Sequence, residues 1–274
     1  MKKGSFSTLV LILVFLTGLS LLLYPTVSDC WNSYHQSKTI AQYSQAVSNL
    51  DSGTYEKLWS DADSYNKSLL HKASRYDMTA EERAEYESLL NVSGNGIIGY
   101  IEIPLINCSL PVYHGTDESV LQVAVGHIEG TSLPVGGIGT HCVLSGHRGL
   151  PSAKLFTNLD KLTEGDEFML QVLDETLTYE VDQILIVEPY EMDSLVIEQD
   201  KDYCTLVTCT PYGINTHRLL VRGHRVENSD EAHAVRVTAD ALQIEPIIVA
   251  PFVAVPMLLI LMIALLVGTR RKKR

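Results

Sequence analysis

Two apolar runs without a charged residue stand near the two ends of this 274-residue chain, and they constrain its topology more than any other feature. The first covers residues 5–27 and the second covers residues 246–268. Each is long enough to cross a bilayer as one helix. Lys2 and Lys3 precede the first run, and five basic residues follow the second. The positive-inside rule therefore predicts a two-pass membrane protein with both ends in the cytoplasm and the intervening residues outside.

Two other interpretations of these runs fit less well. A cleaved signal peptide has a shorter apolar core and a small-residue cleavage site, whereas the first run continues through Leu21, Tyr24 and Pro25. A buried core helix does not explain the basic residues after the second run, which are typical of a stop-transfer flank. We therefore expect two uncleaved membrane anchors.

The segment between the runs is strongly acidic. All 33 Asp and Glu residues fall within it, whereas seven of the 21 Lys and Arg residues fall outside it. The segment thus carries 14 basic against 33 acidic residues, a net charge of −19. Such a charge excludes nucleic-acid binding and suits a soluble domain that faces a polyanionic cell wall.

The first part of this segment, residues 29–93, has a helical and polar pattern. Thr79 and Glu82 form the pattern of a capping box, which marks the start of a helix. We expect the helices to form a stalk packed on the domain that follows. Apolar residues at three- and four-residue spacings predict these helices over residues 31–50, 54–70 and 79–90.

From residue 94 the pattern changes to short β-branched and apolar runs between turn formers. A short helix is expected over residues 120–125 and a helical turn over residues 193–197. Seven or eight strands with short helices between them predict a mainly β fold, a closed or nearly closed barrel. The expected strands cover residues 97–103, 107–113, 140–144, 168–173, 177–187, 205–208 and 218–226.

The last two strands carry a cysteine and an arginine nine positions apart, Cys209 and Arg218. If these strands pair antiparallel, the two side chains lie close together below the connecting loop. A thiol attacks as thiolate, which a neighbouring cation favours. A guanidinium also donates several hydrogen bonds to a developing oxyanion. The pair therefore predicts a cysteine nucleophile with a cationic partner.

A proton shuttle for this pair is expected at His147. It lies on a glycine-flanked turn directly after the strand at residues 140–144, where it can reach another strand end. Ser152 is expected to cap a following helix. The apolar face of that helix would consist of Leu155, Phe156, Leu159 and Leu162.

At these residues the chain resembles the sortases, and specifically the class C sortases, which assemble pili. The resemblance is carried by SGHRGLPSAKLFTNLDKL at residues 145–162 and by TLVTCTPYGINTHRLLVRGHR at residues 205–225. Residues 94–116 and 126–137 carry a weaker likeness. The resemblance implies the eight-stranded sortase barrel, preceded by a helical region and flanked by a transmembrane helix at each end.

The resemblance also implies a mechanism, that of a cysteine transpeptidase. Cys209 would attack the threonine carbonyl of an LPXTG-like sorting signal in a secreted protein. His147 would protonate the leaving amine and later deprotonate the incoming one, while Arg218 would hold the oxyanion. A lysine amine of a pilin would resolve the acyl-enzyme, so that pilus subunits polymerise at the Gram-positive cell wall.

Further residues follow from the same resemblance. Class C sortases often carry a lid with an Asp-Pro-aromatic motif between the second and third helices. This chain has Asp77 and Met78 there, without the proline or the aromatic residue, so a weakened or absent lid is expected. Four residues are expected to line the peptide groove: Thr208, Leu133, Pro134 and His127.

Five segments are thus expected along the chain. They are a cytoplasmic tail and first membrane helix (1–28), an extracytoplasmic helical region with the degenerate lid (29–93), the catalytic barrel (94–228), a linker (229–245), and a second membrane helix with a basic cytoplasmic tail (246–274).

Three alternatives remain open. A housekeeping-type sortase, which anchors surface proteins to a peptidoglycan precursor, shares every catalytic residue, and only the second membrane run weighs against it. A non-enzymatic, membrane-tethered binding domain does not require the intact catalytic residues. A zinc site has suitable ligand types in His141, Cys142, His147 and Cys204 or Cys209, but the ligand spacing is wrong. We expect no metal and no cofactor.

Overall fold

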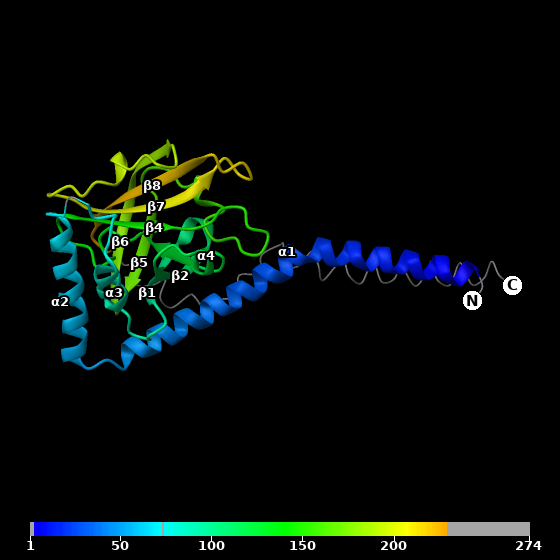
Figure 1. Cartoon of the computed structure of the whole chain (residues 1–274), viewed down its shortest axis with the longest axis horizontal. Coiled ribbons are helices and arrows are strands. Elements are labelled where there is room, and N and C mark those ends of the chain that lie inside the picture. Colours follow the sequence, from blue (N-terminus) through cyan, green and yellow to red (C-terminus); the bar gives the residue numbers. More distant parts are fainter. Residues whose placement is uncertain (1–2, 73, 229–274) are drawn as a thin grey trace. The chain divides into compact units, whose positions relative to one another are not determined.

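The computed structural model describes residues 3–72 and 74–228 of the chain (Figure 1). The predicted linker and second membrane helix, residues 229–268, lie outside these described residues. In chain order the elements are α1 (Lys3–Ser48), α2 (Ser52–Leu69), α3 (Ala80–Ser88), β1 (Ile97–Ile103), η1 (Pro104–Ile106), β2 (Cys108–His114), α4 (Glu118–Leu121), β3 (Val125–His127), β4 (Thr140–Ser145), η2 (Leu159–Lys161), β5 (Glu167–Val172), β6 (Glu175–Val187), η3 (Asp193–Leu195), β7 (Asp202–Thr210) and β8 (His217–Val226).

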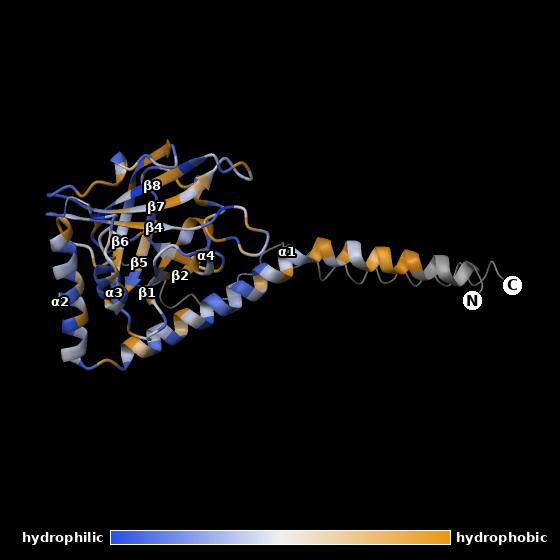
Figure 2. Ribbon diagram, viewed as in Figure 1, coloured by the Kyte–Doolittle hydropathy of each residue, from blue (hydrophilic) through white to orange (hydrophobic). Residues whose placement is uncertain are grey.

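The first helix, α1, is continuous from the apolar run to Ser48, whereas the sequence predicted separate helices over residues 5–27 and 31–50. By length and composition it can cross a membrane: an 18-residue window within residues 10–48 has a mean hydropathy of 2.3. Figure 2 shows the apolar residues in its N-terminal part. Contacts divide the chain into two units, and the second unit begins at Asp29. The later part of α1 therefore belongs with the barrel.

The eight strands close into a barrel in the order β1-β2-β3-β4-β7-β8-β6-β5. The pairs β2/β3 and β4/β7 are parallel, and the other neighbours are antiparallel. The predicted barrel is thus confirmed as closed, which leaves no open sheet edge. β3 was not predicted, because its three residues are too few to show an alternating pattern.

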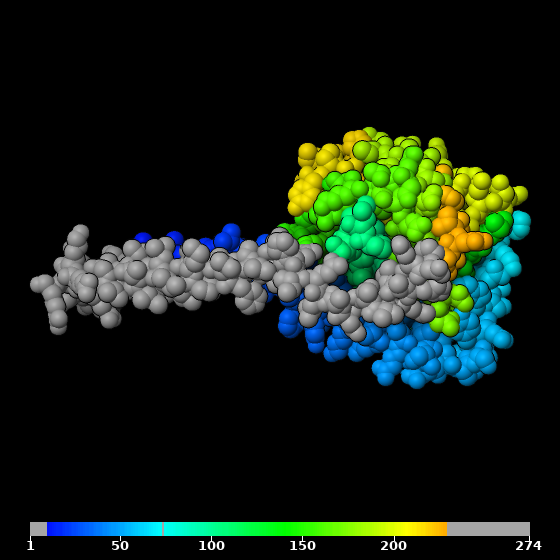
Figure 3. Space-filling model, turned by 180° about the vertical axis from the view of Figure 1, so that it is seen from behind, coloured from blue at the N-terminus to red at the C-terminus, as the bar shows by residue number. Residues whose placement is uncertain are grey.

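The helical region packs on the barrel through buried side chains. Tyr43 of α1 donates from its hydroxyl to the Ile98 carbonyl at 3.1 Å and accepts from the Leu173 amide at 2.8 Å. On α2, Asn66 exchanges two hydrogen bonds with the backbone of Leu133. Seen from behind, the chain from residue 29 of α1 through α2 (blue to cyan) lies along one side of the barrel residues (Figure 3). The predicted capping box at the start of α3 is confirmed.

The helix predicted from Ser152 is wrong. Residues 150–158 form irregular chain, and only the short 3₁₀ helix η2 follows. Leu155 has a φ of +39°, which is incompatible with a right-handed helix. Phe156 and Leu159 are nevertheless fully buried. The apolar spacing thus predicted correctly which side chains are buried, but it did not predict the backbone conformation.

Candidate active site

Cys209 and Arg218 are direct cross-strand partners in the antiparallel pair β7/β8. The predicted pairing of these two strands is therefore confirmed. Both side chains are partly exposed, and a six-residue loop joins the strands above them. The Nη1 atom of Arg218 donates to the His217 carbonyl at 3.1 Å and to the Asn215 carbonyl at 3.4 Å. These bonds hold the guanidinium at the strand end beside the thiol.

The turn that carries His147 is attached to the other side of β7. Ser145, the last residue of β4, pairs with Val207, and the Gly146 amide continues this ladder by donating to the Val207 carbonyl at 3.0 Å. His147 follows Ser145 by two residues, and Cys209 follows Val207 by two residues. The register of the β4/β7 pair therefore brings His147 and Cys209 to the same end of the two strands. The strand order β4-β7-β8 thus places His147, Cys209 and Arg218 at the adjacent ends of three neighbouring strands.

Arg148 supports this turn, and the sequence interpretation assigned no role to it. Its side chain is 9% exposed and forms an ion pair with Asp160. Its Nη1 atom donates to the Thr210 hydroxyl at 3.3 Å, and its guanidinium lies 5.9 Å from the centre of the Tyr212 ring. Arg148 therefore connects the histidine turn to the end of β7 and to the loop after it. The charged residue directly after His147 was the available sequence signal.

Gly149 is required at the end of the same turn. Its φ is +77°, a conformation that favours glycine. A Cβ atom at this position would also lie 2.9 Å from the Tyr212 ring. Gly149 therefore allows the His147 turn to touch the loop after β7.

An apolar cluster on the outer face of the barrel leads to Cys209. Side chains alternate between the two faces of a strand, so Cys209 faces the same side as Val207, and Arg218 the same side as Leu220. We name as the outer cluster the buried residues Val143, Val187, Leu195, Val207 and Leu220. The sequence interpretation missed it because strands buried on both faces read as continuous apolar runs.

The four predicted groove residues have a different environment. Thr208 faces the barrel interior, is 2% exposed, and donates from Oγ1 to the Gly146 carbonyl at 2.7 Å. Leu133 and Pro134 are buried, and Leu133 is bonded to α2. His127 is fully buried. These positions favour structural roles over contact with a peptide, and Thr208 holds the turn that bears His147.

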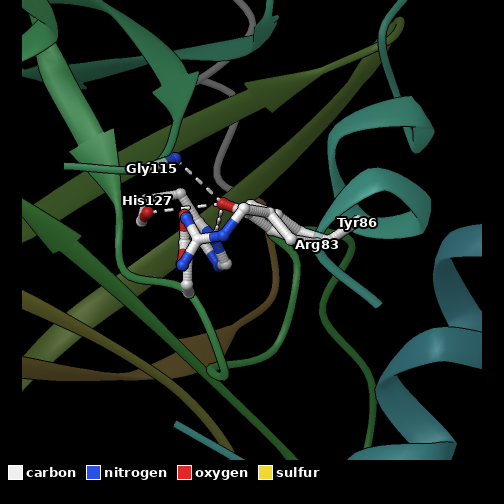
Figure 4. A network of polar contacts seen from close by, with 5 residues as sticks. Arg83, Tyr86, Gly115 and His127 are labelled. Atoms are coloured by element: carbon white, nitrogen blue, oxygen red, sulfur yellow. Dashed lines mark hydrogen bonds and ion pairs between the residues drawn. The ribbon is translucent and has the colours of Figure 1, made fainter. Parts of the chain in front are cut away.

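His127 belongs to a buried network that fixes α3 on the barrel (Figure 4). Its Nε2 atom lies 2.8 Å from the Ser132 carbonyl, which can only accept, so Nδ1 accepts from the Tyr86 hydroxyl at 2.8 Å. The Gly115 amide donates to the same hydroxyl at 3.1 Å. Burial raises the pKa of Tyr86, which keeps this phenol protonated and able to donate. Arg83 and Glu129 add an ion pair at the rim.

The segment at the expected lid position lies against the connection between β6 and β7. Arg75 donates from Nη2 to the Leu195 carbonyl at 2.7 Å. Asp77 is exposed and lines a hollow together with Val196. Met78 packs partly against the main core. Among the described residues, no ion pair joins Asp77 to Arg218.

The five cysteines are unpaired thiols. Cys142 and Cys204 are buried and lie opposite each other in the register of the β4/β7 strand pair. Cys30 is exposed and Cys209 is partly exposed. Cys204 and Cys209 are five positions apart on one strand and face opposite sides of it, which prevents a bridge between them. No cluster of three metal-ligating side chains occurs in residues 3–72 and 74–228.

Comparisons with known proteins match this fold. A sortase domain model matches residues 101–226. Sortase D of Bacillus subtilis (strain 168) is 32% identical over 131 residues, which are 47% of this chain and 63%, less than two thirds, of that protein.

Solved structures give longer matches. The crystal structure of sortase C1 from Streptococcus agalactiae has a TM-score of 0.68 and 53% identity, and the match covers 70% of this chain and 100% of that one. Sortase C of Clostridium perfringens, solved with the C-terminal cell wall sorting motif, has a TM-score of 0.63 and 45% identity, with coverage of 70% and 100%. On this evidence the chain belongs to the sortase family of cysteine transpeptidases, among its class C members.

Proposed function

We propose that this sortase cleaves an LPXTG-like sorting signal and transfers the acyl group to a lysine amine of a pilin, which polymerises pilus subunits. The observation that carries the proposal is the row of His147, Cys209 and Arg218 at the ends of β4, β7 and β8. The sorting motif named for the Clostridium perfringens relative supports the substrate class. The class C relatives support a pilin acceptor over a wall precursor.

The first half-reaction is acylation of Cys209. Its sulfur attacks the threonine carbonyl carbon, and Arg218 donates hydrogen bonds to the oxygen that becomes negative. The carbon–nitrogen bond then breaks. His147 gives a proton to the departing glycine nitrogen, and a thioester remains on Cys209.

The second half-reaction transfers the acyl group. A neutral lysine amine attacks the thioester carbon, and His147 takes a proton from the attacking nitrogen. The carbon–sulfur bond breaks, an isopeptide bond forms, and the thiolate returns. Water can replace the amine, so slow hydrolysis is the expected side reaction.

The outer cluster is buried and supports the strand ends that carry the thiol and the guanidinium. It lies on the face of β7 and β8 that presents Cys209 and Arg218. Thr208, Leu133, Pro134 and His127 contribute indirectly, since they shape the barrel behind this face. Asp77 and Met78 form at most a weak lid, because no ion pair joins Asp77 to Arg218 among the described residues and the motif lacks its proline and aromatic residue.

The enzyme is proposed to be anchored at both ends, with its catalytic unit outside the cell. α1 has the length and composition of a membrane helix, and the apolar run at residues 246–268 has the composition of a second one. The basic residues beyond each run favour cytoplasmic ends. This topology places the active site where membrane-retained pilins emerge.

A mass spectrum of the intact protein tests this function. The full-length protein in detergent is incubated with an LPXTG peptide, and the thioester adduct is mapped by digestion. We expect an adduct on Cys209 that lacks the glycine side of the peptide, and its absence in Cys209→Ala. Cys30→Ala is the matched control because Cys30 is the exposed thiol. An adduct on another cysteine, or no cleavage by the wild type, would contradict the proposal.

A further inference from the structure

The acceptor step makes a demand that His147, Cys209 and Arg218 do not meet. A lysine side chain has an ordinary pKa of about 10.4 and therefore arrives as an ammonium. Arg218 lies directly beside the thiol, and it repels a second cation. An anionic side chain close to His147 would offset this repulsion and concentrate amines at the base.

Glu118, the first residue of α4, has this position. Its Oε2 atom lies 4.0 Å from Nε2 of His147, and its side chain is 74% exposed. Gln122, one turn later, donates from Nε2 to the Oε1 atom of the same carboxylate. One oxygen is therefore held, and the other faces both His147 and solvent.

The barrel sets the spacing between these two residues. α4 is followed by β3, which pairs with β4, the strand that leads into the His147 turn. The Ala124 amide donates to the Val120 carbonyl at 2.9 Å, and Gln36 of α1 donates to the Val123 carbonyl at 2.7 Å. The backbone of α4 is therefore tied to the residue before β3 and to α1, which places Glu118 beside the His147 turn.

Two other acidic residues in this region have an Arg or Lys partner. Asp160 is paired with Arg148, and Asp29 with Lys154. Glu118 differs, because within residues 3–72 and 74–228 the 4.0 Å contact with His147 is its one contact with a basic side chain, and no Lys or Arg lies within 4 Å. Its charge is thus available for a cation that comes from outside the chain.

We propose, on the basis of the function given above, that Glu118 binds the ammonium of the incoming lysine beside His147 and so favours lysine over water as acyl acceptor. The bound ammonium releases one proton to solvent. As the neutral nitrogen attacks the thioester carbon, its next proton passes to His147, the carbon–sulfur bond breaks, and Cys209 leaves as thiolate. Glu118 is a specificity-determining residue that keeps its charge throughout.

A neutral nucleophile separates this role from a purely orienting one. If Glu118 only oriented the imidazole of His147, its loss would slow attack by every nucleophile that His147 deprotonates. If it binds the ammonium, its loss affects charged amines alone. Hydroxylamine is uncharged near neutral pH and serves as the neutral probe.

The experiment measures how the acyl-enzyme of the full-length protein partitions among acceptors. Glu118→Gln keeps the shape of the side chain and its bond to Gln122. The acceptors are Nα-acetyl-lysine amide, hydroxylamine and water. Asp117→Asn is the matched control, because it removes an exposed carboxylate one residue away that has no bond to His147.

We expect the half-saturating concentration of the lysine acceptor to rise roughly two- to five-fold in Glu118→Gln, the range for an exposed ion pair. Hydroxylamine transfer, thioester formation and hydrolysis stay unchanged, as does every reaction of Asp117→Asn. The difference should disappear at high salt, because exposed charges are screened.

Two results would overturn the role of Glu118: unchanged use of lysine by Glu118→Gln, or an equal loss with lysine and hydroxylamine. Both leave the proposed function intact, since the thioester still forms. Failure of the wild type to form a thioester on Cys209 would instead remove the proposed function itself.

Discussion

Cys209 on β7 faces Arg218 on β8 as a directly paired residue of the antiparallel ladder. Directly opposed residues of such a pair have Cβ atoms about 4.5–5.5 Å apart, so the guanidinium is close to any group attached to the sulfur. Two backbone carbonyls hold Nη1 of Arg218. The remaining donors of the guanidinium are oriented by the start of β8 and by the loop before it, which suits stabilisation of a developing oxyanion.

The first prediction concerns this guanidinium. Arg218→Ala should lower the rate of Cys209 acylation by roughly 10²–10³-fold, the usual effect of removing an oxyanion donor. Arg218→Lys should recover little, because an ammonium does not replace the planar fork. The measurement is the single-turnover rate of thioester formation with an LPXTG peptide.

Arg222→Lys is the matched control for this change. Arg222 lies on the same strand and forms two hydrogen bonds to Asp182, at 2.9 and 3.1 Å. Its replacement should reduce stability slightly and leave the acylation rate unchanged. A rate for Arg218→Lys equal to that of the wild type would show that charge alone is sufficient.

A second prediction concerns the hydroxyl of Thr208. Thr208→Val removes the bond to the Gly146 carbonyl, which holds the turn bearing His147. We expect a loss of about 1 kcal/mol in stability, typical of a buried hydrogen bond. We also expect slower leaving-group protonation, seen as a lower acylation rate.

Thr205→Val separates an effect on the position of the His147 turn from an effect on the stability of the fold. Thr205 is equally buried on the same strand, but its hydroxyl is bonded to His141, not to the His147 turn. It should lose similar stability with an unchanged acylation rate. If both variants slow acylation equally, Thr208 acts only through stability.

A third prediction concerns the lid position. Asp77→Ala should leave turnover of an LPXTG peptide within about two-fold of the wild type, because Asp77 is exposed and has no ion pair with Arg218 in the described part of the chain. Asp61→Ala, an exposed carboxylate on α2, is the control. A large gain in turnover for Asp77→Ala alone would establish this residue as a working gate.

Strands with clear alternation could be predicted from the sequence, and so could the pairing that joins Cys209 to Arg218. A turn-rich loop between two apolar runs permits one simple connection, an antiparallel pair, and the register then follows from the loop length. β3 could not be predicted, because its three residues are too few to show an alternating pattern.

The predictions that depended on side-chain environment were less informative. Thr208 adjoins Cys209 in sequence and His127 lies in the family-like stretch at residues 126–137, but alternation along their strands turns both into the interior. Glu118 had no sequence signal, since exposed acids are common in this chain and only the fold brings this one to His147. The run from Ser152 has helical spacing, yet the positive φ of Leu155 bends it into irregular chain.

The last prediction concerns pH and the buried histidines. Burial lowers the pKa of His114 to about 4, and burial likewise lowers the pKa of His141 to about 4. Both values are below the ordinary pKa of histidine, about 6.5. As the pH falls from about 6.5 the unfolded chain binds protons that the folded chain does not, so stability is lost down to about pH 4 and levels off below it.

His114→Phe tests this slope. Neither ring nitrogen of His114 has a hydrogen-bond partner among the described residues, and its ring packs edge-on against Tyr86. An apolar ring should therefore keep the packing and remove one titrating group. Each such histidine contributes up to about 1.4 kcal/mol per pH unit, so the variant should lose less stability than the wild type between pH 6.5 and pH 4.

Urea unfolding of the full-length protein in detergent, followed by the fluorescence of Trp59, measures this difference. Trp59 packs against the main core and therefore reports its loss. His71→Phe, which removes an exposed histidine just after α2, is the matched control. Because His114 and His141 lie on different strands, their effects should add. A wild-type stability that is flat between pH 6.5 and pH 4 would mean that these rings gain protons in the folded state as readily as in the unfolded one.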